Sequence, residues 1–451
     1  MARTIDFTEG NIRASLLRFA LPLFLGNLFQ QLYNTADSLI VGNFLGQTSL
    51  AAVSSSSSLV FMLVSFFNGI AMGAGVVIAR AVGSKDKERI QKAVHTDIAF
   101  GLASGIFMTL FCAILTPVFL RWMRTPEDIM PESISYLRIY TLGILFSLMY
   151  NISMGILNAV GDSKHPLYYL IFSSIVNIIL DLLFILVFKM GVGSAAMATV
   201  ISQALSVILC LGKLVKDKTD YQISIRKIRF DIPILKDILI NGIPSGVQNS
   251  VIGFANTVVQ TNINMFGSIA VASAGIYKKL EGFAFLPITS FTMALTTCIS
   301  QNMGANKIER AKKGALFGIA CSMILAELIG VVFFFFGDHL MRLFNDSPEV
   351  IALGARQSKI ESLFFMFLAL SHCIAAILRG AGRATVPMVV MLSVWCGLRV
   401  TYLTVMLKLI SRVEIVFSCY PVTWSISSII FIIYLVKSDW TSPKHLSRKT
   451  K

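Results

Sequence analysis

Residues 165–189 read HPLYYLIFSSIVNIILDLLFILVFK, a run of 25 residues whose only acidic or basic side chains besides His165 are Asp181 and Lys189. A helix that crosses the hydrocarbon core of a bilayer needs about 20 mostly apolar residues. The run lacks the strict alternation of polar and apolar residues that is typical of strands in a membrane barrel. It therefore predicts a membrane-spanning helix.

Eleven other segments share this character, so the chain of 451 residues is expected to cross the membrane twelve times. Its composition agrees, because 55% of the residues are apolar and only 14% are charged, against roughly 25% charged in an ordinary soluble protein. That balance excludes a soluble enzyme, a disordered chain and a disulfide scaffold. The predicted spans cover residues 15–42, 49–80, 93–122, 133–160, 165–189, 191–215, 236–265, 269–303, 312–343, 350–379, 384–409 and 413–437.

The basic residues predict how the chain is oriented. The formal net charge is +15, from 39 Lys and Arg against 24 Asp and Glu. Eighteen of the basic residues lie in connections that follow even-numbered spans, and at most nine lie in connections that follow odd-numbered spans. Because cytoplasmic loops carry the excess of Lys and Arg, we expect a multi-pass protein of the cell (cytoplasmic) membrane with both termini in the cytoplasm. The excess charge then needs no nucleic-acid partner.

Two halves of the sequence can be superimposed. Residues 83–92 (GSKDKERIQK) match residues 304–313 (GANKIERAKK), and residues 157–166 (LNAVGDSKHP) match residues 378–387 (LRGAGRATVP), both 221 positions apart. Pro22 and Asn34-Thr35 match Pro244 and Asn256-Thr257 at an offset of 222. Each half holds six spans, which predicts parallel repeats with a substrate site between them.

The repeat divides the chain into an N-terminal six-helix lobe at 1–215, a cytoplasmic linker at 216–235, a C-terminal six-helix lobe at 236–437 and a cytoplasmic tail at 438–451. The linker contains DKTDYQISIRKIRFDIP. We expect it to be solvated, with an amphipathic patch that lies on the membrane surface.

Several motifs resemble those of the multidrug and toxic compound extrusion (MATE) family, prokaryotic type. They include LPLFLGNLFQQLYNTADSLIVGNFLG at 21–46, NAVGDSKHP at 158–166 and KKLEGFAFLP at 278–287. The resemblance implies an all-α membrane protein with twelve transmembrane helices in two homologous six-helix lobes around a central cavity. It also implies a secondary active antiporter that exports amphipathic, often cationic drugs by alternating access in exchange for H⁺ or Na⁺. No cofactor is expected beyond the coupling ion, and we expect a monomer.

Two other functions remain to be weighed. A lipid-linked oligosaccharide flippase of the same superfamily is the alternative, although such proteins tend to have a strongly basic cavity for a pyrophosphate. A membrane enzyme is not expected, because the sequence has no HExxH, GxSxG or P-loop signature.

Acidic residues inside predicted spans are candidates for ion coupling, because intramembrane carboxylates usually face a cavity or a partner. Asp37 lies in the first predicted span, Asp181 lies in the fifth, and Asn177 is one helical turn before Asp181. The resemblance places the coupling site at these three positions. They suit a carboxylate whose proton affinity is raised by burial, or a Na⁺ ion held by oxygen ligands. Polar neighbours expected to contribute are Asn34, Asn151 and Thr199.

The second half lacks this acidic pair, since Asp37 corresponds to Val258 or Val259 and Asp181 to Tyr402. Its own polar residues are candidates for a substrate cavity, and Lys278 is placed to pair with Glu281 three residues later. Arg399 is expected to need an acidic partner, and Glu327 is expected to be a packing group. The substrate-cavity candidates are Glu281, Lys278, Lys279 and His372.

Pro22 is a candidate hinge. Proline removes a backbone donor and bends a helix, and the resemblance implies that the first helix straightens or bends here when its aspartate changes protonation.

Overall fold

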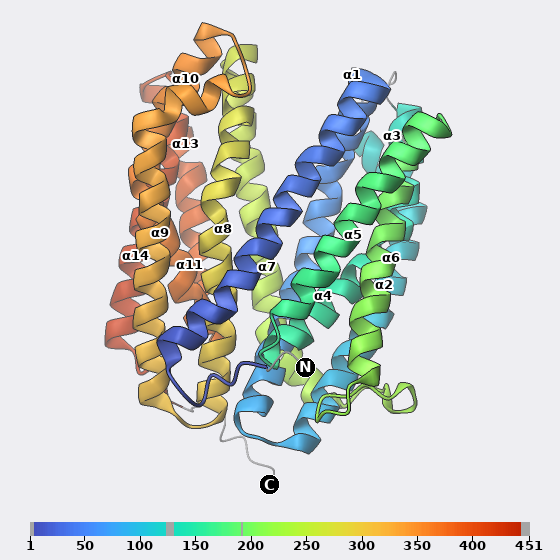
Figure 1. Cartoon of the computed structure of the whole chain (residues 1–451). Helices are drawn as coiled ribbons and strands as arrows, with labels where there is room; N and C mark the ends of the chain where they lie inside the picture. Colours follow the sequence, from blue (N-terminus) through green and yellow to red (C-terminus); the bar gives the residue numbers. More distant parts are fainter. Residues whose placement is uncertain (1–3, 123–129, 191–192, 443–451) are drawn as a thin grey trace. The chain divides into compact units, whose positions relative to one another are not determined.

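The computed structural model describes residues 4–122, 130–190 and 193–442, which form helices and connecting loops without strands (Figure 1). Within these ranges, the side chains of residues 36–39, 41–63, 119, 122 and 132 are not described. The α-helices are α1 (Ile12–Gly83), α2 (Lys87–Trp122), α3 (Met130–Leu142), α4 (Ile144–Ala159), α5 (Lys164–Leu182), α6 (Gly193–Lys216), α7 (Ile232–Asn264), α8 (Ser268–Gly304), α9 (Ile308–Arg342), α10 (Pro348–Glu361), α11 (Phe365–Gly380), α12 (Thr385–Met391), α13 (Arg399–Leu409) and α14 (Val413–Lys437).

Ten helical segments in the described part of the chain are long and apolar enough to cross a membrane, and the pair Ser133–Leu142 and Ile144–Ala159, bent by 43°, makes an eleventh. Helix α1 contains two of the ten, Ile12–Thr35 and Val64–Gly83. The remaining predicted span is α7, which has 33 residues but is more polar than the others. Large apolar side chains are exposed along α2, α5 and α9, as expected for helices that face lipid. The chain is therefore a multi-pass membrane protein.

Four of the predicted spans contain a break or a wider turn. The predicted span at 133–160 is α3 and α4, and that at 350–379 is α10, a 3₁₀ turn at Ser362–Phe364 and α11. The predicted spans at 165–189 and 384–409 contain π-helical segments at Leu183–Val187 and Leu392–Leu398. Hydropathy alone does not reveal these features, which often mark functional sites.

The backbone confirms the internal repeat. Lys85 and Asn306, which are 221 residues apart, both have a φ of 57°, and Gly161 and Gly382, also 221 apart, have φ values of 90° and 79°. The hydrogen bonds that close these turns also repeat. For example, the Asp162 N–H donates to the Leu157 carbonyl and the Arg383 N–H to the Leu378 carbonyl, both at 2.8 Å. The two halves thus share loop geometry as well as sequence.

The chain forms two compact units. Unit 1 comprises Met1–Asp6 and Leu25–Gly246, and unit 2 comprises Phe7–Phe24 and Val247–Lys451. The first part of α1 therefore belongs to unit 2, and the first part of α7 belongs to unit 1. The two boundaries, after Phe24 and after Gly246, are 222 residues apart, which is the offset between Pro22 and Pro244. The predicted lobes follow the sequence repeat, whereas the two units are defined by which segments pack together.

Glycines bring two helical segments of unit 1 into backbone contact. A Cβ built on Gly69 of α1 would lie 2.3 Å from the Gly246 Cα, and one built on Gly73 would lie 2.4 Å from the Gly242 Cα. This small-xxx-small pattern on both helices permits the close approach that is common between membrane helices. It accounts for the assignment of the first part of α7 to unit 1.

Residues 7–11, which directly precede α1, are held within unit 2. The Arg310 Nε donates to the Phe7 carbonyl at 2.7 Å, and the Lys307 Nζ donates to the Thr8 carbonyl at 2.8 Å. The Phe7 ring is fully buried and packs edge-on against Phe19. Two of the basic residues that predict a cytoplasmic loop thus also anchor the N-terminal segment.

Most side chains of the linker are exposed or half-buried, and a few of its residues contact the rest of unit 1. Ile223 is 4% exposed, and the Ser224 N–H donates to the His95 Nε2 at 3.0 Å. Lys87 forms an ion pair with Asp220 at 3.1 Å. These contacts attach the linker to the rest of unit 1, while its apolar side chains Ile225 and Ile232 are 77% and 68% exposed.

Candidate functional site

The predicted coupling residues in α5 and α6 lie together in unit 1. Asp181 is 0% exposed, Asn177 is 1% exposed and Thr199 is 8% exposed. The Asn177 Oδ1 accepts the Thr199 backbone N–H at 3.2 Å, and the Asn177 Nδ2 donates to the Asp181 Oδ2 at 2.9 Å. The amide orientation follows from its neighbours, because a backbone N–H can only donate and so must face the oxygen.

The other polar candidates of unit 1 differ in their surroundings. The Asn151 Nδ2 donates to the Ser147 carbonyl of its own helix at 2.8 Å, and the Thr199 hydroxyl donates to the Ala195 carbonyl at 3.0 Å. Asn34 is exposed on α1. The side chain of Asp37 lies outside the described residues.

The donor set at Asp181 bears on the identity of the coupling ion. A Na⁺ ion at Asp37, Asp181 and Asn177 would need oxygen ligands. Asn177 instead presents its amide nitrogen to Asp181, and its oxygen is engaged by a backbone N–H. In this amide orientation, the Asp181 carboxylate accepts a hydrogen bond from Asn177.

Pro22 lies inside α1, two residues before the boundary at Phe24 between the part of α1 in unit 2 and the part in unit 1. A missing backbone hydrogen bond near such a boundary is a point at which a helix bends easily.

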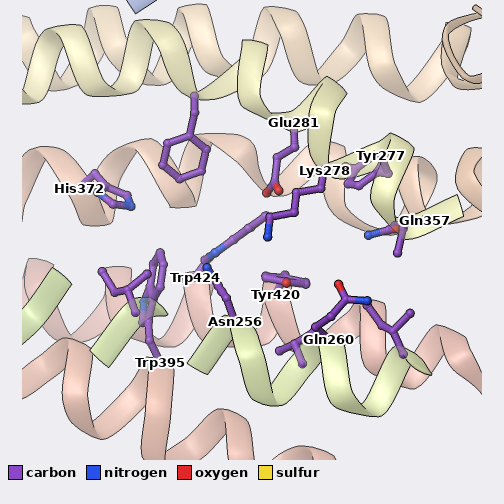
Figure 2. Close-up of a pocket in the computed structure, with 15 residues that line it drawn as sticks. Asn256, Gln260, Tyr277, Lys278, Glu281, Gln357, His372, Trp395, Tyr420 and Trp424 are labelled. Atoms are coloured by element: carbon purple, nitrogen blue, oxygen red, sulfur yellow. The ribbon is translucent and has the colours of Figure 1, made fainter. Parts of the chain in front are cut away.

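A second polar site lies wholly inside unit 2. It is a cavity of about 130 Å³ between α7, α8, α10, α11, α14 and the π-helical segment before α13. Figure 2 shows Lys278 and Glu281 pointing from α8 into this space, towards Asn256 and Tyr420. The lining residues are Ile252, Asn256, Val259, Gln260, Ile263, Ala274, Tyr277, Lys278, Glu281, Phe285, Gln357, His372, Trp395, Tyr420 and Trp424.

Three of the four predicted substrate-cavity residues, Lys278, Glu281 and His372, line this cavity. Lys279 does not, because consecutive helix residues point about 100° apart. Lys278 and Glu281 do not form an ion pair within 4.0 Å, in contrast to the expected pairing, and neither of them has another such partner among the described residues. The imidazole of His372 packs edge-on against Phe285 and Trp395, at 5.4 Å from each ring.

Arg399 forms no ion pair within 4.0 Å among the described residues, but the carboxylates of Glu281 and Glu361 are close enough to interact with its charge. Arg399 is 0% exposed and donates to the Asn256 Oδ1 at 3.2 Å and to the Thr423 Oγ1 at 2.9 Å. Its guanidinium lies 5.1 Å from the Trp395 ring centre and 4.7 Å from that of Tyr420. Two aromatic faces and two neutral acceptors thus hold this buried cation.

Sequence reasoning missed most of the cavity wall. Gln357, Tyr420 and Trp424 carry no motif, although the repeat match of Asn34-Thr35 with Asn256-Thr257 already singled out Asn256. Behind the wall, Glu361 is 1% exposed and accepts a hydrogen bond from the Gln357 Nε2 at 2.9 Å.

Glu327 has a local structural role. Its Oε2 accepts the Met366 backbone N–H at 3.0 Å, at the start of α11, where helix N–H groups have no intrahelical partner. A carboxylate at this position also complements the positive end of the helix dipole. Glu327 therefore stabilises the break between α10 and α11.

The model of the MatE family matches residues 22–183 and, a second time, residues 244–403. These ranges make up most of the chain, and they begin at the two equivalent prolines. The chain belongs to the MATE family. Its membership explains the repeat, because each half carries one copy of the family domain.

MATE relatives resemble the chain over nearly its whole length. The probable multidrug resistance protein YpnP of Bacillus subtilis (strain 168) is 30% identical over 402 residues, which cover 87% of this chain and 88% of that protein. The probable multidrug resistance protein YoeA of the same organism is 28% identical over 436 residues, covering 95% and 94%.

Solved structures share the fold. An outward-facing multidrug resistance MATE family transporter of the MOP superfamily superposes with a TM-score of 0.90 at 22% identity, over 96% of this chain and 97% of that chain. A MOP superfamily transporter from Pyrococcus furiosus Vc1 (DSM3638) also gives a TM-score of 0.90 at 22% identity, over the full length of both chains.

Proposed function

We propose that this MATE protein is a multidrug efflux antiporter of the cell membrane, which exports amphipathic, often cationic compounds in exchange for protons. Family membership and the names of the similar bacterial proteins support efflux. The observation that carries the coupling part of the proposal is the buried Asn177–Asp181 pair in a membrane span.

A buried carboxylate in a span is costly when ionised, so a site of this kind responds to proton uptake. Asp181 takes up or releases a proton. The Asn177 amide, whose oxygen accepts the Thr199 N–H of α6, holds the Asp181 carboxylate in place. Asp37, in the first span of the same half, is the principal coupling residue in this proposal. Protonation of Asp37 would change the charge of the first span, which also contains the Pro22 hinge, and bias one of two conformations.

The proton is favoured over Na⁺ because Asn177 offers a donor to Asp181. An ion-selective test follows. Dye efflux measured in inverted vesicles under an imposed pH gradient, and separately under an imposed Na⁺ gradient, should proceed with the first and not with the second. Efflux driven only by Na⁺ would overturn the choice of ion.

Substitutions test the residues. Asp37→Asn keeps size and hydrogen bonding but removes the titratable charge, so it should abolish gradient-driven efflux while expression is unchanged. Asp181→Asn should slow efflux by about tenfold or more, which corresponds to at least about 1.4 kcal/mol. Glu327→Gln, which keeps an acceptor for the Met366 N–H, is the control and should export normally.

The flippase alternative gives the opposite pattern. If expression supports the translocation of a lipid-linked sugar and no cationic dye is exported, the flippase function replaces the antiporter proposed here.

A further inference from the structure

The linker between α6 and α7 exposes three large apolar side chains. Ile225, Phe230 and Ile232 are 77%, 46% and 68% exposed. In contrast, Ile223 and Ile228 of the same segment pack on the apolar core of unit 1. Because exposed apolar side chains that are rimmed by polar residues mark sites of interaction with proteins or membranes, the outer side of the linker is a candidate interaction surface.

Two hydrogen bonds place this surface beside the point at which α2 enters the bilayer. The Ser224 N–H donates to the His95 Nε2 at 3.0 Å. The Asp231 N–H donates to the Thr96 Oγ1 at 3.1 Å. Both acceptors lie at the start of the third predicted span, and the first exposed large apolar side chain of α2 is Leu102, about 9 Å further along the helix. Since each headgroup layer of a bilayer is roughly 5–8 Å thick, the linker lies next to the lipid headgroups.

The acidic residues of this part of the chain are already engaged. Residues 213–240 contain seven basic and four acidic side chains. Each acidic side chain lies within 4.0 Å of a basic one, in the pairs Asp217–Lys213, Asp220–Lys87, Asp231–Lys92 and Asp237–Arg89. The basic residues among these seven are therefore in excess over the acids that could neutralise them.

Four exposed basic residues flank the three apolar side chains, and none of them forms an ion pair within 4.0 Å with another described residue. Arg229 also lies close enough to Lys92 for the two charges to repel each other, although Lys92 is bound by Glu88 at 2.7 Å. An anion bound here would relieve this repulsion. We call these seven residues the linker patch, which consists of Ile225, Arg226, Lys227, Arg229, Phe230, Ile232 and Lys236.

We propose that the linker patch binds anionic phospholipids of the leaflet next to it. The basic side chains contact the charged headgroups, and the apolar side chains enter the boundary between headgroups and acyl chains. A soluble anion would match the charges but leave the apolar side chains in water, and an uncharged apolar partner would leave the charges unmatched. An anionic lipid surface matches both. This assignment depends on the membrane position of α2 and α6, and it does not depend on which compound the protein exports.

A tryptophan placed in the linker patch reports its contact with lipid. Phe230→Trp replaces one exposed aromatic side chain by another, and the full-length protein is reconstituted into phosphatidylcholine nanodiscs. Quenching of its fluorescence by brominated phosphatidylglycerol is compared with quenching by brominated phosphatidylcholine at equal mole fractions, after subtraction of the quenching in protein without the added tryptophan. The apparent affinity for phosphatidylglycerol should be higher by about fivefold or more, the factor that corresponds to one basic residue near an anionic surface.

Charge removal tests the basic side chains. On the Phe230→Trp background, Arg226→Gln combined with Lys227→Gln should lower the ratio of the two affinities by about twofold or more. The matched control is Lys312→Gln combined with Lys313→Gln, which removes two adjacent exposed lysines of unit 2 and should leave the ratio unchanged. Raising the ionic strength should lower the ratio without any substitution, so the test does not depend on how well the double variant accumulates.

Three results would overturn the proposal. Equal affinities for the two lipids would show that the linker patch does not select anionic headgroups, and equal falls of the ratio in the two double variants would show that the selection arises elsewhere. If neither lipid quenches the added tryptophan, the surface is not in contact with the bilayer and its occupant is a soluble partner. Ile225→Trp, at a more exposed position of the same patch, provides a second reporter and should give the same contrast.

Discussion

Replacing Gly69 by alanine adds only one methyl group, but it should clearly lower the stability of unit 1. The added Cβ would lie 2.3 Å from both the Cα and the N of Gly246, and 2.6 Å from the Ser245 carbonyl carbon. All three are backbone atoms, so no side-chain rotation relieves the overlap. Ordinary contacts begin at 3.4 Å, so the two helices must separate by about 1 Å. Overpacking of this kind typically costs about 1–3 kcal/mol.

Gly212→Ala in α6 is the matched control, because a Cβ at Gly212 would meet no atom within 4 Å. Alanine in a helix interior is favoured over glycine by about 0.5–1 kcal/mol, so this variant should be neutral or slightly more stable. The two substitutions are chemically identical and lie in the same unit. Their difference therefore reports packing alone.

The assay is thermal unfolding in detergent, followed by reaction of a maleimide dye with buried free cysteines such as Cys112 and Cys210. With about 2–4 °C per kcal/mol for a unit of this size, Gly69→Ala should lower the midpoint by about 2–12 °C at a fixed heating rate. A midpoint equal to or above the wild-type value, or an equal fall in Gly212→Ala, would refute the glycine contact.

Three further outcomes are expected. Glu327→Ala removes the acceptor of the Met366 N–H and should lower the free energy of unfolding by about 1.5–3 kcal/mol. Glu327→Gln should lower it by less than half as much. Equal thermal unfolding midpoints for the two variants would contradict the capping role. His95→Ala removes the acceptor of the Ser224 N–H, so amide hydrogen exchange of residues 220–230 should accelerate about tenfold or more. An unchanged exchange rate would show that the linker does not depend on His95. A cysteine placed at Lys218 should react with an impermeant maleimide only from the cytoplasmic side, and labelling from outside would reverse the predicted orientation.

Much of the fold could be predicted from the sequence, because its signals are local. A membrane span needs about 20 apolar residues in a row, and the run at 165–189 satisfies this regardless of the rest of the chain. The duplicated loops at 83–92 and 304–313 are equally local, since their residues close their own turns. The breaks at 143 and 362–364 were missed because apolar composition continues through them.

Part of the candidate site followed from the sequence as well. Asn177 and Asp181 share a helical face because they are four residues apart, and the consecutive residues Lys278 and Lys279 point in different directions because each helix residue turns by about 100°. The hydrogen-bond partners of these residues could not be predicted from the sequence, because they depend on which helices lie close together in space. The backbone N–H that fixes the Asn177 amide belongs to Thr199 of another helix.

The sequence by itself determined that this protein is a duplicated, multi-pass member of the MATE family, with the acidic pair Asp37 and Asp181 in its first half. Only the tertiary structure decided that Arg399 binds Asn256, 143 residues away, and that Lys278 and Glu281 stay apart in one cavity. It also decided that the first part of α7 packs with unit 1 and that the linker is anchored. These outcomes depend on contacts of a few ångströms between distant segments, which are set by how helices pack, and no local pattern of residues encodes such distances.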